Sequence, residues 1–110
     1  MAKLANLARM TTATAGTGTI TLGAAVSGFK TFAQAGITDG MRVSYAIKDG
    51  SNSELGEGVY TSSGTTLTRV VASSTNSDSA INLSGTAEVF ITPSAASLLR
   101  IESPGGRLTL

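Results

Sequence analysis

The chain has 110 residues with a formal net charge of +1, and it contains no Cys, His or Trp. Their absence excludes a disulfide framework, a thiol nucleophile, a Ser-His-Asp triad and an ordinary zinc site. Only 14% of the residues are charged and the two signs nearly cancel, so we expect no nucleic-acid-binding surface.

Length and hydropathy favour one domain that does not enter a membrane. The chain has no run of roughly 18 apolar residues, and residues 1–10 lack the apolar core of a secretory signal. We therefore expect a cytosolic origin. The 30 Ser and Thr residues and the low charge predict a neutral, hydroxyl-rich surface, which favours a subunit packed in an assembly.

The first part of the chain predicts an arm, a strand and a helical turn. Residues 1–16 carry apolar side chains at intervals and predict an N-terminal arm. Residues 17–22 (TGTITL) are β-branched and predict the first strand. In residues 29–35 (FKTFAQA), Phe29 and Phe32 are expected to meet on one side of a helical turn, which the next glycine ends.

The middle of the chain predicts an antiparallel meander. Residues 41–48 (MRVSYAIK) alternate strictly, which is typical of a strand with one buried face. A polar turn leads to residues 54–61 (ELGEGVYT), where Gly56 and Gly58 share a face and indicate a bulge or a close neighbour. Residues 65–72 (TTLTRVVA) predict the third strand of the meander.

The last part predicts a loop, two strands and a second helical segment. Residues 73–80 are almost entirely Ser, Thr, Asn and Asp and predict an exposed loop. Residues 81–83 predict a short strand, and residues 87–92 (AEVFIT) are apolar on both faces, which indicates a central strand. After Pro93, residues 94–99 (SAASLL) predict one or two helical turns.

About six strands at a spacing of roughly 8–12 residues predict an all-β fold. We expect a small antiparallel β-sandwich or barrel-like domain with short helical turns and extended termini. The predicted organisation is an N-terminal arm over residues 1–16, a single β domain over 17–99 and a C-terminal tail over 100–110.

Charged residues suggest three candidate sites, each with a simpler interpretation. Asp49 to Glu54 supplies oxygen ligands but fails the spacing of a calcium loop, so a hairpin turn is preferred. Glu54 and Glu57 are three positions apart on a strand, which places them on opposite faces rather than as a catalytic pair. The third candidate is a set of three cations, Arg42, Lys48 and Arg69. They could form an anion site on one sheet face, or they could be solvated side chains or interface salt-bridge partners.

Arg69 is expected at a sheet rim or next to a carboxylate such as Glu57. We predict no enzymatic activity, no metal and no cofactor.

The two ends and two polar loops are the candidate interaction sites. Apolar side chains near the ends gain little by remaining in water, which favours contact with a neighbouring subunit. The alternative for the C-terminal tail is an edge strand on its own sheet. The candidate interface residues are Leu4, Leu7, Leu108 and Leu110. The residues expected in outward-facing loops are Asp49, Asn52, Asn76 and Asp78.

Most of the chain, from Leu4 to Ala96, resembles a small module of tailed bacteriophages and prophages, found in tail-fibre-like and other virion proteins. The matching segments are LAN (4–6), TATAGTGTITLGAAVSGFKTF (12–32), AGITDG (35–40), VSYAIKDG (43–50), ELGEGVYTSSGTTLTR (54–69) and INLSGTAEVFITPSAA (81–96). The resemblance implies a structural role in the virion and brings no catalytic residues. Because only about 14 residues follow the module, we expect no fibre shaft to be attached. A capsid decoration protein or a small tail or fibre component is therefore expected.

These observations predict a homo-oligomeric virion protein that contacts other capsid or tail subunits and binds no nucleic acid or membrane. The alternative is a module that binds a carbohydrate or a host receptor through its polar loops. The absence of Trp weighs against that alternative, because sugar stacking favours aromatic side chains.

Overall fold

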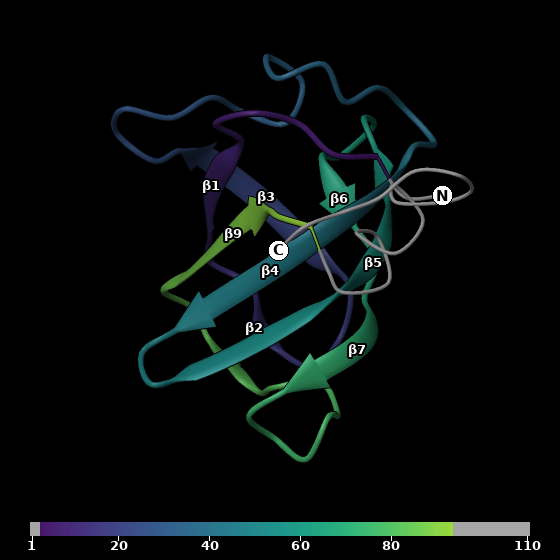
Figure 1. The fold of residues 1–110 in the computed structure, drawn as a ribbon. Coiled ribbons are helices and arrows are strands. Elements are labelled where there is room, and N and C mark those ends of the chain that lie inside the picture. The colour runs from purple at the N-terminus through teal and green to yellow at the C-terminus, as the bar shows by residue number, and fades with distance from the viewer. Residues whose placement is uncertain (1–2, 94–110) are drawn as a thin grey trace, which may run out of the picture.

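The computed structural model describes residues 3–93, whose fold is shown in Figure 1. Nine strands form the regular structure of this part of the chain, and no helix is present in it. In chain order the strands are β1 (Arg9–Thr12), β2 (Ala15–Gly16), β3 (Ile20–Ala25), β4 (Arg42–Asp49), β5 (Asn52–Thr61), β6 (Thr66–Leu67), β7 (Val70–Ser74), β8 (Leu83–Ser84) and β9 (Ala87–Ile91).

Six strands close into an antiparallel barrel in the order β4-β9-β1-β3-β6-β5, and β5 pairs back with β4. The long strand β5 uses its other edge twice, pairing with β7 at one end and with β6 at the other. The short strands β2 and β8 pair separately. The prediction of an all-β antiparallel fold is confirmed, and of the two architectures expected the chain adopts the barrel.

The strand predicted over residues 41–48 builds one wall of the core, but Ser44 and Ala46 on its other face are buried as well, so the prediction of a single buried face is wrong. Val43, Tyr45 and Ile47 on β4 are fully buried. β4 pairs with β5 along its whole length, down to a two-residue loop after Asp49. The first loop residue is Gly50 with φ 64, because a tight hairpin requires a positive φ there. The strand predicted to be central, β9, lies between β4 and β1, as expected.

The two glycines of β5 allow the barrel to close. A Cβ atom on Gly58 would lie 1.9 Å from the carbonyl oxygen of Thr68, and one on Gly56 would lie 2.2 Å from that of Val70. The pairing of β5 with β7 shifts register between Leu55 and Gly56. Both alternatives predicted from these glycines, a bulge and a close neighbour, are therefore present.

The predicted helical turns are not seen in the described residues. Residues 32–36 form one hydrogen-bonded turn, which Gly36 ends at φ 102. A single turn does not propagate, since helix nucleation is unfavourable in so short a segment. Phe32 is fully buried whereas Phe29 is 41% exposed, so the prediction that the two rings meet is wrong. The second helical segment, 94–99, lies outside the described residues.

The chain joins the sheet earlier than the predicted boundary at residue 16. β1 lies between β9 and β3, with Met10 and Thr12 buried on the inner face. Strand propensity alone did not indicate this strand, because its stability comes from hydrogen bonds to partners far away in the sequence.

Candidate functional site

One cluster of charged and polar side chains lies inside the barrel, next to β5. Arg69 and Glu54 form a two-point ion pair, with Nε 2.9 Å from Oε2 and Nη2 2.5 Å from Oε1. The Tyr45 hydroxyl donates to Oε2 at 2.7 Å, and the backbone amide of Ile81 donates to Oε1 at 2.9 Å. The side chains of Arg69 and Glu54 are 2% and 0% exposed, so water has no access to the pair.

The remaining donors of Arg69 are also occupied by the protein. The guanidinium donates to the carbonyl oxygens of Ile81 at 2.8 Å and of Gly16 and Gly18, both at 3.2 Å. The cluster therefore connects β4 and β5 with segments near residues 16–18 and 81. Because every partner belongs to the fold, we interpret the cluster as structural rather than catalytic.

The protonation states of the cluster support this interpretation. Burial by itself raises the pKa of Glu54, but hydrogen bonds from Arg69, Tyr45 and the Ile81 amide outweigh burial and hold that pKa below its usual value. Burial, then the hydrogen bond and charge of Glu54, raise the pKa of Tyr45. Burial lowers the pKa of Arg69, but the interactions with Glu54 outweigh burial and raise it. No group of the cluster is poised to exchange a proton near neutral pH.

The predicted anion site is not formed. Arg69 is inside the barrel, while Nη1 of Arg42 lies on the outer surface 3.5 Å from Oε1 of Glu57. Lys48 donates to a carbonyl oxygen of its own hairpin at 3.0 Å. Of the two alternatives predicted for Arg69, contact with a carboxylate is confirmed, but the carboxylate is that of Glu54 rather than that of Glu57. Arg69 lies between β6 and β7, so the alternation of a single continuous strand over residues 65–72 does not explain its placement.

The two carboxylates considered as a catalytic pair point to opposite faces, as the spacing predicts. Glu54 is fully buried, whereas Glu57 is part of an outer ion pair. Within residues 3–93, no group of three His, Cys, Asp or Glu side chains could hold a metal ion. These residues also contain no helix long and apolar enough to span a membrane.

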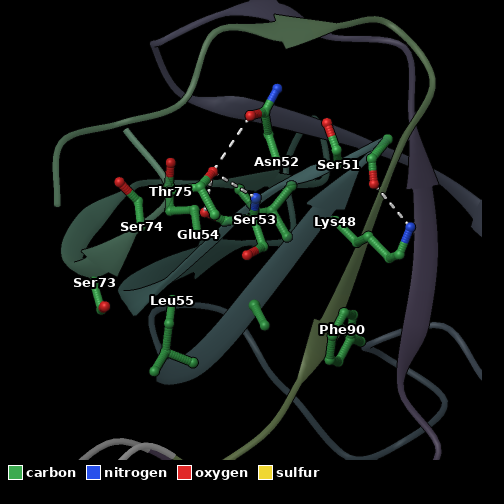
Figure 2. Close-up of a pocket in the computed structure, with 13 residues that line it drawn as sticks. Lys48, Ser51, Asn52, Ser53, Glu54, Leu55, Ser73, Ser74, Thr75 and Phe90 are labelled. Atoms are coloured by element: carbon green, nitrogen blue, oxygen red, sulfur yellow. Dashed lines mark hydrogen bonds between the residues drawn. The ribbon is translucent and has the colours of Figure 1, made fainter. Parts of the chain in front are cut away.

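A groove of about 460 Å³ runs over the outside of β4, β5 and β7 (Figure 2). Its apolar side chains come from three neighbouring strands, because Ala46 on β4 pairs with Leu55 on β5 and with Phe90 on β9. The other lining side chains are mostly hydroxyls and an amide, together with one cation: Lys48, Ser51, Asn52, Ser53, Ser73, Ser74 and Thr75. The groove therefore combines an apolar patch with a polar rim.

The predicted loop residues have different roles. Asn52 and Asn76 are exposed and line a second hollow, so the fold brings these two together. Asp78 is exposed and accepts hydrogen bonds from the hydroxyl of Ser73 and the amide of Ser74, which fixes the turn after β7. The prediction that Asp49 is exposed is wrong.

Asp49 is 8% exposed because its carboxylate accepts two hydrogen bonds from Ser84 on β8. The amide of Ser84 lies 2.7 Å away and its hydroxyl 2.8 Å away. Asp49 therefore holds the small β2–β8 pair against the β4–β5 hairpin.

Two of the predicted interface residues, Leu4 and Leu7, are 38% and 58% exposed. Leu108 and Leu110 lie outside the described residues. The sequence did not identify Phe29 as a surface residue, because Phe29 and Phe32 are the same residue type in the same short segment. Phe29 ends a turn in which its amide donates to the carbonyl oxygen of Val26 and Gly28 has a φ of 88.

No protein-family profile, curated protein or solved structure matches the chain.

Proposed function

We propose that the chain is a non-enzymatic structural protein of a tailed-phage virion. In this proposal it is synthesised in the bacterial cytoplasm, is present in several copies, and contacts capsid or tail subunits as a decoration protein or a small tail or fibre component. The resemblance of residues 4–96 to virion modules motivates the proposal.

The observation that carries it is the contrast between a closed interior and an apolar outer segment. The interior charges are paired with one another, while Leu4 and Leu7 are held in solvent beside the barrel. Large exposed apolar side chains that cluster on a small protein mark a surface that another molecule covers.

The test is the copy number of the chain in purified particles of the phage whose genome encodes it. Quantitative mass spectrometry, normalised to the major capsid protein, is expected to give hundreds of copies for a capsid component or a multiple of three or six for a tail component. Particles that contain no copy of the chain would overturn the proposal.

The outer groove favours a second candidate, a module that binds a carbohydrate or a host receptor. Phe90 provides an aromatic surface, and the hydroxyl and amide groups of the rim match the hydrogen-bonding groups of a sugar. Glycan-array binding by the purified protein, lost in Phe90→Ala, would support this candidate. Equal signals from Phe90→Ala and the unmodified chain would contradict it.

A further inference from the structure

Three of the four large apolar side chains that are exposed in residues 3–93 lie on two neighbouring segments. Leu4 and Leu7 precede β1, and Phe29 lies in the loop after β3. The two segments are joined by a hydrogen bond of 2.7 Å from the amide of Lys30 to the carbonyl oxygen of Leu7. Figure 1 shows the purple segment before β1 crossing one end of the barrel next to the blue loop. We call Leu4, Leu7 and Phe29 the N-terminal apolar patch.

The backbone at Leu7 is fixed in an unusual conformation. Its φ is 64, in the left-handed region that a leucine rarely adopts. Lys30 holds it there, because its amide binds the carbonyl oxygen of Leu7 and its carbonyl oxygen accepts from the amide of Arg9 at 3.1 Å. Backbone strain of this kind persists only where the surroundings impose it, and it is concentrated at functional positions.

Phe29 is supported by a second set of contacts. The guanidinium of Arg9 lies 5.6 Å from the centre of the Phe29 ring and 4.7 Å from that of Phe90. Glu88 on β9 fixes Arg9 through an ion pair of 2.6 Å. Leu7 and Phe29 are therefore preorganised, which lowers the entropy lost when a partner binds.

The charges near the patch indicate the kind of partner. Residues 1–38 contain Lys3, Arg9 and Lys30 but no Asp or Glu. Arg9 is neutralised by Glu88, while Lys3 and Lys30 are exposed on the same two segments as the patch. A partner that covers the patch therefore approaches Lys30, which follows Phe29, and Lys3, which precedes Leu4.

We infer that the N-terminal apolar patch is the docking site for another protein subunit of the particle, which presents an apolar pocket bordered by carboxylates. The inference rests on the proposed virion function and names the partner's chemistry. A second copy of the chain fits less well, since a twofold contact through this patch would bring the lysines of both copies together. A membrane fits less well because only two lysines adjoin the patch, fewer than in polybasic lipid-binding clusters.

The experiment measures binding of the purified full chain to particles that lack it. Leu7→Glu and Phe29→Glu are each expected to weaken binding at least about tenfold, as for a central interface residue. Val70→Glu is the matched control, since Val70 is 62% exposed and lies on β7 outside the patch. It is expected to bind as the unmodified chain does, and thermal unfolding verifies that all variants are folded.

A charge-reversal variant tests the two lysines next to the N-terminal apolar patch. Lys3→Glu with Lys30→Glu is expected to weaken binding and to reduce its salt dependence, because the lysines face carboxylates in the partner.

The remaining outcomes distinguish failure of the proposed function from failure of the docking inference. If the unmodified chain does not bind the particles, the proposed function fails. If the unmodified chain binds and Leu7→Glu binds equally well, only the inference fails. Two results would reassign the patch: a dimer in sedimentation that Leu7→Glu dissociates, and Leu7-dependent binding to phosphatidylglycerol vesicles.

Discussion

The ion pair inside the barrel and the ion pair at its outer rim use the same residue types in different surroundings. Arg69 and Glu54 are buried and held by a two-point contact. Arg42 and Glu57 lie 3.5 Å apart, with side chains that are 56% and 26% exposed. Removing one partner of a buried pair leaves an uncompensated charge, whereas an exposed pair is screened by water and salt. The barrel therefore depends on one pair and scarcely on the other.

The largest expected effect comes from Arg69→Met. This change removes the buried positive charge that pairs with Glu54 and takes the guanidinium donors away from three carbonyl oxygens. The hydrogen bonds from Tyr45 and Ile81 to Glu54 remain, but they carry no positive charge, and we expect a loss of about 3–5 kcal/mol in the free energy of unfolding, measured in urea. The double variant Glu54→Gln with Arg69→Met is expected to recover part of this loss. A single variant that unfolds at the same urea concentration as the unmodified chain would contradict the structural role of the pair.

The next effect comes from Gly58→Ala, which tests how the barrel closes. The added Cβ would overlap the backbone of Thr68, so β5 and the chain between β6 and β7 must separate. We expect a loss of about 2–4 kcal/mol in the same measurement. Gly18→Ala is the control, since a Cβ there meets nothing within 4 Å. Equal stability of the two variants would show that the close approach at Gly58 is unimportant.

The buried pair also predicts a pH dependence. Because the pKa of Glu54 is lower in the folded chain than its usual value of 4.5, the pair contributes full stability above that value. This contribution decreases as the pH falls below about 4.5 toward the folded pKa. The melting temperature is expected to fall less steeply over this range in the double variant Glu54→Gln with Arg69→Met. Parallel curves for the two proteins would contradict the assignment.

The smallest effect is expected for Arg42→Ala, at the outer pair. We expect a change below about 0.5 kcal/mol in the free energy of unfolding, and less in 1 M salt. A loss comparable to that of Arg69→Met would remove the contrast between the two pairs.

Local patterns predicted the parts of the fold that depend on neighbours in sequence. The hairpin of β4 and β5 follows from the alternation of residues 41–48 and the glycine in its turn, since side chains two apart share a face. The sequence also predicted that another segment approaches β5 closely at Gly56 and Gly58, because two glycines on one face leave that face without side chains. Both features come from the geometry of a single hairpin.

Features that depend on distant segments were not predictable in the same way. The sequence predicts Asp49 in an exposed turn, and its burial is explained only by the hydrogen bonds that Ser84 donates to it. The sequence shows Leu4 and Leu7 as apolar residues near an end, and their role at an interface stays a prediction. Their alignment with Phe29 requires Lys30 to pair with the chain at Leu7, a contact that no local pattern indicates.

The sequence by itself determined an all-β chain, the β4–β5 hairpin and the absence of Cys and His chemistry, because these follow from composition and from alternation within a strand. Only the tertiary structure decided that the sheet closes into a barrel, that Arg69 binds Glu54 and that Phe32 is buried while Phe29 is exposed. These outcomes depend on which distant segments meet, and long-range pairing is set by the packing of the whole core rather than by any single segment.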